Sequence, residues 1–125
     1  MSKRILVVDD EPDIVETVKA RLRSRGYEVM TALRGRDALD LIERIKPDLI
    51  ILDIMMPGVD GTELSETLRL RDSTKTIPII FLTALQTKLE EKAKGPWVAG
   101  KIVLAKPFDA IQLLEHIETI FSQHS

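Results

Sequence analysis

The chain contains no cysteine, and its 125 residues include only one tryptophan and one tyrosine. The absence of cysteine excludes disulfide bonds, thiolate catalysis and cysteine-ligated zinc, and it is compatible with a reducing compartment. Long apolar runs are also missing. The first run, Ile5 to Val8, is far too short for a membrane span or for the core of a signal peptide. We therefore expect a cytoplasmic protein that has no contact with a membrane.

An excess of positive charge is absent as well. Eighteen basic residues stand against twenty acidic ones, which gives a formal net charge of -2. This balance lacks the basic surface of a nucleic-acid-binding domain, so no direct binding to nucleic acid is expected. The hydrophobic fraction of 44% and the charged fraction of 30% are those of an ordinary globular protein. The length suits one compact core, and we expect residues 1–125 to form a single domain.

Short apolar runs rich in branched residues recur along the chain and are the size of strands. Their apolarity is continuous rather than alternating, which indicates burial on both faces, as in a parallel sheet. A weaker fifth segment, Tyr27 to Ala32, alternates apolar and polar residues in the manner of an edge strand. The four continuous runs are Ile5–Val8, Leu49–Leu52, Ile77–Leu82 and Ile102–Leu104.

Segments with helical spacing separate these runs, and five strand-helix units joined by right-handed crossovers predict a doubly wound α/β fold. We expect a (βα)5 three-layer sandwich around a parallel five-stranded sheet. The fourth helix has a capping box at Thr87 and Glu90, but Gly95-Pro96 must end it early. The apolar positions expected to face inward are Ile14, Val18 and Leu22; Ala38, Leu41, Ile42 and Ile45; Leu64 and Leu68, after Gly61; and Leu113, Leu114, Ile117, Ile120 and Phe121, after a cap at Asp109.

Polar side chains follow the buried strands. Asp9 and Asp10 come after the first run, Asp53 after the third predicted strand, Thr83 after the fourth and Lys106 after the fifth. The carboxyl ends of the strands in an open α/β sheet meet in one crevice, and this crevice is where ligands bind. Residues almost a whole chain length apart are therefore expected to form one site.

Three carboxylates in one crevice repel one another, so a cation is expected among them. Oxygen ligands without histidine or cysteine suit Mg²⁺, with Mn²⁺ as a possible substitute. A metal, the ammonium of Lys106 and the hydroxyl of Thr83 around one aspartate suit phosphoryl transfer. Asp53 would be the nucleophile, and the product would be an acyl phosphate.

These residues resemble the receiver domain of two-component response regulators, from Ile5 to about Phe121. The resemblance depends on four motifs in the family's order. They are Val7-Val8-Asp9-Asp10-Glu11, Leu52-Asp53-Ile54-Met55-Met56-Pro57-Gly58 with Asp60-Gly61, Leu82-Thr83-Ala84, and Lys106-Pro107-Phe108.

The resemblance implies a flavodoxin-like fold with strand order 2-1-3-4-5. It also implies that Asp10 and Asp53 bind Mg²⁺ directly, that Asp9 binds it through water, and that the main-chain carbonyl of Met55 is a further ligand. Thr83 and Lys106 would then contact the phosphoryl oxygens.

The resemblance further implies the kinds of partner. A histidine kinase or a histidine phosphotransfer protein would supply the phosphoryl group, and a downstream protein target would read the phosphorylated state. The chain would act as a signalling switch rather than as an enzyme on other substrates. We expect a monomer or a weak dimer, either as a stand-alone receiver or as one excised from a larger protein.

Other interpretations remain open. Asp9 or Asp10 would serve equally well to cap the first helix, and threonine is common in strands for its shape alone. A phosphatase of the haloacid dehalogenase type needs a second aspartate where this chain has Met55, and a flavin or nucleotide carrier needs a phosphate-binding loop where this chain has acids. A receiver-like interaction module that acts without phosphorylation is the main alternative.

The sequence departs from the family pattern in the early end of the fourth helix, in the spacing from Thr83 to Lys106, which is one residue longer than in the commonest members, and at one residue. Most receivers have tyrosine or phenylalanine three residues before the lysine, where this chain has Val103. The single tryptophan, Trp97, is compatible with either a core position or a partner contact.

Overall fold

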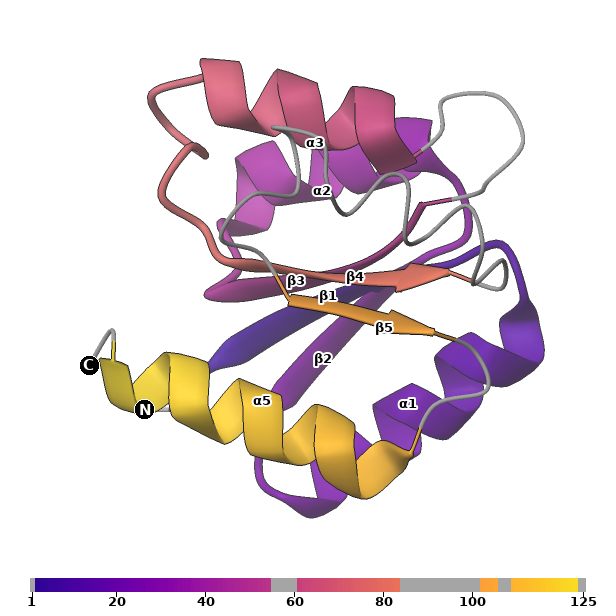
Figure 1. Ribbon diagram of the computed structural model, residues 1–125. Coiled ribbons are helices and arrows are strands. Elements are labelled where there is room, and N and C mark those ends of the chain that lie inside the picture. Colours follow the sequence, from indigo (N-terminus) through magenta and orange to yellow (C-terminus); the bar gives the residue numbers. More distant parts are fainter. Residues whose placement is uncertain (1, 55–60, 84–101, 106–108, 124–125) are drawn as a thin grey trace.

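The computed structural model describes residues 2–54, 61–83, 102–105 and 109–123, in which strands alternate with helices (Figure 1). The predicted fourth helix and Trp97 lie outside the described residues. Among those described, no helix is long and apolar enough to cross a membrane. The elements are β1 (Arg4–Val8), α1 (Pro12–Ser24), β2 (Glu28–Ala32), α2 (Gly35–Ile45), β3 (Leu49–Asp53), α3 (Gly61–Leu70), β4 (Ile79–Thr83), β5 (Ile102–Ala105) and α5 (Ala110–Gln123).

The five strands form one parallel sheet in the order β2-β1-β3-β4-β5. This order and the flavodoxin-like fold that it defines confirm the expectation from the sequence. The central strand β3 lies between β1 and β4, with Ile51 opposite Val7 on one side and Ile80 on the other. The weak fifth segment is an edge strand, as predicted.

Two apolar layers cover the two faces of the sheet, because successive side chains of a strand point to opposite faces. On β3, Leu49 and Ile51 pack in the layer that contains α1 and α5, whereas Ile50 and Leu52 pack in the layer that contains α2 and α3. Figure 1 shows these helix pairs on opposite sides of the sheet. The continuous apolar runs are therefore buried on both faces, as their composition predicted. Val103 is partly buried in the second layer.

The helices begin and end close to the predicted signals. α1 starts at Pro12, and the chain turns after it at Gly26, which has a φ of 90°. α2 ends at Ile45, and Lys46 adopts a left-handed conformation with a φ of 53° directly before Pro47. The buried side chains of α1 are Val15, Val18 and Leu22, while Ile14, which was predicted to face inward, is only partly buried.

The last helix follows the prediction closely. The carboxylate of Asp109 accepts a hydrogen bond from the main-chain N–H of Ile111 at 2.9 Å, which caps the helix. The buried side chains of α5 are Leu113, Leu114, Ile117 and Ile120.

The edge strand begins one residue later than predicted. Tyr27 lies before β2 and packs its ring on Phe121, with 5.6 Å between the ring centroids. Burial, with a further contribution from Glu118, raises the pKa of the Tyr27 phenol.

The hydrogen bond from Thr74 to the last turn of α3 can be tested by substitution. The buried hydroxyl of Thr74 donates to the carbonyl of Leu68 at 2.6 Å. Thr74→Val should lower the free energy of unfolding by about 0.5–1.5 kcal/mol, because it removes one hydrogen bond while the Leu68 carbonyl keeps the longer bond from the N–H of Arg71 at 3.4 Å. Thr67→Val is the matched control, since the Thr67 hydroxyl bonds the carbonyl of Glu63 on the exposed side of the same helix. Urea denaturation measures both variants, and equal stability losses would contradict the prediction.

Candidate functional site

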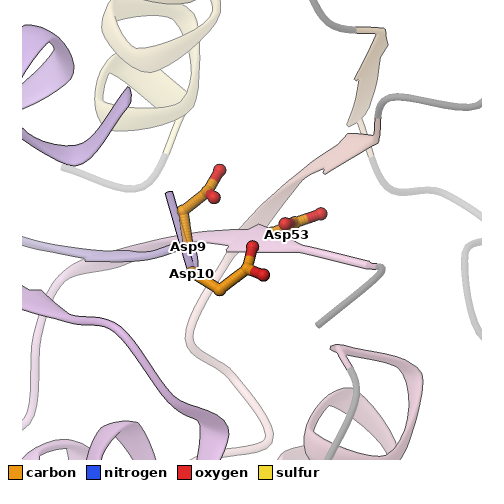
Figure 2. Close-up of side chains that lie close together, drawn as sticks. All are labelled: Asp9, Asp10 and Asp53. Carbon is orange, nitrogen blue, oxygen red and sulfur yellow. The ribbon is translucent and has the colours of Figure 1, made fainter. Parts of the chain in front are cut away.

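Three aspartates come together at the carboxyl edge of the central sheet. β1 ends at Val8 and is followed by Asp9 and Asp10, while Asp53 is the last residue of β3. These two strands pair directly, with Val8 opposite Leu52, so the acids after them become neighbours. Figure 2 shows the three side chains at the ends of the two strands. The convergence predicted from the sequence is therefore present in the structure.

The three carboxylates are close enough to share one ion. One carboxylate oxygen from each of Asp9, Asp10 and Asp53 lies within 4.8 Å of the other two. Asp9 and Asp53 are buried, with exposed fractions of 0% and 2%, whereas Asp10 is exposed. The cluster thus has two buried members and one exposed member, Asp10.

The backbone around Asp9 holds this side chain in place. Its main-chain N–H donates to the carbonyl of Ala32 at 3.2 Å, which extends the pairing of β1 with β2 by one residue. Its Oδ1 accepts a hydrogen bond from the main-chain N–H of Glu11 at 2.9 Å. This turn was not predicted from the sequence, although an aspartate that accepts from the N–H two residues on is a known turn signal.

The alternative interpretation of these acids as a helix cap is wrong. The N-cap residue of α1 is Glu11, and no side chain makes a cap hydrogen bond there. Pro12 at the first helical position lacks an N–H, so the helix has one fewer donor to satisfy. Asp9 shapes the turn before the helix instead.

The other predicted residues are placed by the backbone or lie outside the described residues. Thr83 ends β4 and pairs with Ala105, the last residue of β5. Ala105 is therefore at the same edge of the sheet as the aspartates, and Lys106 follows it directly in the sequence. Lys106 and Met55 themselves lie outside the described residues. The structure therefore brings together Asp9, Asp10 and Asp53 and puts the backbone of Thr83 at their edge.

The donor set fits a hard divalent cation. All three groups are carboxylates, and oxygen donors suit Mg²⁺ or Mn²⁺ rather than the softer metals. Two carboxylates at the observed separation repel each other by about 3 kcal/mol at an effective dielectric constant of about 20. A divalent cation between them would turn this repulsion into attraction.

Many proteins of known structure are similar to this chain. Residues 5–118 match the family of response regulator receiver domains. A putative response regulator from Chloroflexus aurantiacus is 36% identical, with a TM-score of 0.86, over 98% of this chain and 99% of that chain. The response regulator protein TrrA from Thermotoga maritima, whose structure is a complex with Mg²⁺-BeF, is 37% identical, with a TM-score of 0.81, over 94% of this chain and 97% of that chain. The chemotaxis response regulator CheY4 of Vibrio cholerae is 33% identical, with a TM-score of 0.81, over 96% of this chain and 99% of that chain.

Proposed function

This chain belongs to the response regulator receiver family, and on that premise we propose that Asp53 accepts a phosphoryl group in the presence of Mg²⁺. The observation that carries the proposal is the convergence of Asp9, Asp10 and Asp53 within 4.8 Å at the carboxyl edge of the sheet. Receiver domains act as switches that respond to phosphorylation. For this chain the switch would begin with the formation of an acyl phosphate.

The chemistry of Asp53 follows from its place. One carboxylate oxygen attacks the phosphorus of the donor, an O–P bond forms, and the bond between phosphorus and the donor breaks, with its electron pair leaving on the donor. Asp53 is buried and is the last residue of β3, so the strand holds its carboxylate in place. A carboxylate held in this way loses little freedom when it reacts.

The metal ligands are assigned by the same proposal. Asp10 and Asp53 bind Mg²⁺ directly, Asp9 acts through a water molecule, and the main-chain carbonyl of Met55 completes the protein's share. When bound, the ion neutralises charge on the transferring phosphoryl group. Mn²⁺ is a substitute with the same preference for oxygen. TrrA, a relative with Mg²⁺-BeF bound, supports the choice of Mg²⁺.

Thr83 and Lys106 would complete the site. The hydroxyl of Thr83 and the ammonium of Lys106 contact the phosphoryl oxygens in this proposal, and their contacts report to the rest of the domain whether Asp53 is phosphorylated. The support for these roles is positional, because Thr83 and Ala105 pair at the end of β4 and β5, beside β3.

The proposed partners are proteins. A histidine kinase or a histidine phosphotransfer protein donates the phosphoryl group, and a downstream target protein reads the switched state. The formal net charge of -2 supports protein partners over direct binding to nucleic acid. We propose a cytoplasmic location, a single domain over residues 1–125 and a monomer or weak dimer.

A small phosphodonor tests the proposal without knowledge of the natural kinase. The chain should gain one phosphoryl group when it is incubated with acetyl phosphate and Mg²⁺, as measured by intact mass spectrometry. Excess EDTA should prevent the gain, because the carboxylates would then face the anionic donor without a cation. A chain that stays unmodified in Mg²⁺ would instead support the alternative, an interaction module that acts without phosphorylation.

A further inference from the structure

Within the part of the chain that the structure describes, the strand β2 has one side without a neighbouring strand, since it stands at the end of the sheet order. The direction of its backbone groups follows from its register with β1. The N–H of Glu28 donates to the carbonyl of Lys3, and the carbonyl of Ala32 accepts from the N–H of Asp9. Alternate residues of a parallel strand point both backbone groups the same way. Glu28, Met30 and Ala32 therefore face β1, whereas Val29 and Thr31 face outward.

The outward side of β2 has the features of a pairing surface. Val29, Met30, Thr31 and Ala32 carry no charge, and Glu28 at the first position is the only charged residue of the strand. Exposed edges of this kind pair readily with strands of other chains unless a charged side chain, a proline or a cover prevents it. Leu33, directly after the strand, is exposed, with 44% of its surface accessible.

One side chain lies over this edge. The guanidinium of Arg23, in the last turn of α1, donates to the carbonyl of Val29 at 3.5 Å. The bond is long, so its own energy is small. The position of the guanidinium matters more, because it places a charged group at the outward carbonyl of Val29, which an added strand would need as a hydrogen-bond acceptor. Arg23 is exposed on its other side and thus keeps its hydration.

We propose that the outer edge of β2 is a self-association surface for a second copy of this chain, and that Arg23 holds it closed. The strand is complementary to itself when two copies meet antiparallel about a two-fold axis at Met30. Val29 of each copy then faces Thr31 of the other, and both residues exchange N–H···O bonds.

The flanking residues favour the same partner. In this arrangement Glu28 of one copy faces Ala32 of the other, so the two Glu28 carboxylates stand at opposite ends and do not oppose each other. The exposed Leu33 of one copy comes next to Tyr27 of the other, which is partly buried on its own chain. A leucine beside an aromatic ring across two strands is a favourable pair.

Arg23→Ala tests the proposal in the absence of metal and phosphodonor. Sedimentation velocity over a series of protein concentrations should show a dimer dissociation constant at least about tenfold lower than that of the wild type, or about 1.4 kcal/mol. Arg21→Ala is the matched control, because it removes an arginine from the same last turn of α1. If Arg23→Ala and Arg21→Ala sediment alike, the proposal is wrong.

A second variant locates the surface. Thr31→Pro in the Arg23→Ala background removes an outward N–H that pairs with nothing in the sheet, and a proline is tolerated at such edge positions. This double variant should return to the monomer, and a dimer that persists would place the association elsewhere and overturn the proposal. If the proline variant does not fold, amide hydrogen exchange of the Arg23→Ala variant tests the proposal instead. The amides of Val29 and Thr31 must exchange more slowly in associated Arg23→Ala than in the monomer, and unchanged exchange would overturn the proposal.

Discussion

Replacing Asp53 with asparagine should abolish phosphoryl uptake and leave the fold intact. The amide has the shape of the carboxylate, but its nitrogen and its neutral oxygen are poor nucleophiles toward phosphorus. The backbone of residue 53 pairs with Leu82 through main-chain groups, which the substitution does not change. Intact mass after incubation with acetyl phosphate and Mg²⁺ should show no added phosphoryl group, while circular dichroism should remain that of the wild type.

A matched substitution distinguishes the loss of the nucleophile from a general effect of charge. Asp40→Asn removes one carboxylate from the exposed outer side of α2, where Asp40 pairs with Arg44 at 3.4 Å. This variant should accept one phosphoryl group as the wild type does. Full, Mg²⁺-dependent labelling of Asp53→Asn would show that another group of the crevice, such as Asp10, is the acceptor.

The second large effect concerns the metal. Asp10→Asn should weaken Mg²⁺ binding at least about tenfold, a loss of about 1.4 kcal/mol. Asp10 is the exposed member of the cluster, so its carboxylate can bind an ion that arrives from solvent. Asp9 is fully buried and already uses one oxygen to hold the N–H of Glu11. The direct ligand should therefore be Asp10, with Asp9 acting through water.

Ion binding can be read from stability as well as from calorimetry. A ligand that binds only the native state raises its stability by about 2.7 kcal/mol at a hundredfold excess over the dissociation constant. Thermal melting with and without Mg²⁺ should show this gain in the wild type and in Asp13→Asn, which removes an exposed acid from the first turn of α1. Asp10→Asn should show a much smaller gain. If Asp9→Asn lost more of the gain than Asp10→Asn, the two roles would be reversed.

Most of the fold was predictable because the apolar runs are continuous and the helices have clear ends. The errors have local causes. The fourth run was predicted from Ile77, but β4 begins at Ile79, because Pro78 has no N–H to donate and contributes only its carbonyl, which accepts from Ile50. Tyr27 lies outside the edge strand because its main-chain N–H donates to the carbonyl of Leu22 in the last turn of α1 at 3.3 Å.

The sequence predicted which aspartates form the site but not how exposed each of them is. The rule that strand ends meet at one edge was enough to bring Asp9, Asp10 and Asp53 together. It did not indicate that Asp9 would be buried and Asp10 exposed, since this difference depends on the turn between β1 and α1. That turn is fixed by the hydrogen bond from the N–H of Glu11 to the carboxylate of Asp9. From sequence spacing alone, the Asp9 carboxylate was equally compatible with a cap of α1.

The direct pairing of β1 with β3 also governs when the site comes into existence as the chain folds. Ile5 pairs with Leu49, so the helix-rich stretch between them must be arranged before the two strand ends can meet. Contacts between such distant segments form late compared with local helices, because the loop that they close costs entropy first. A partly folded chain therefore has the three aspartates but not their cluster. Under the function proposed above, only a chain with a complete central sheet would bind the metal ion and accept a phosphoryl group, so incompletely folded copies would not respond to a phosphodonor.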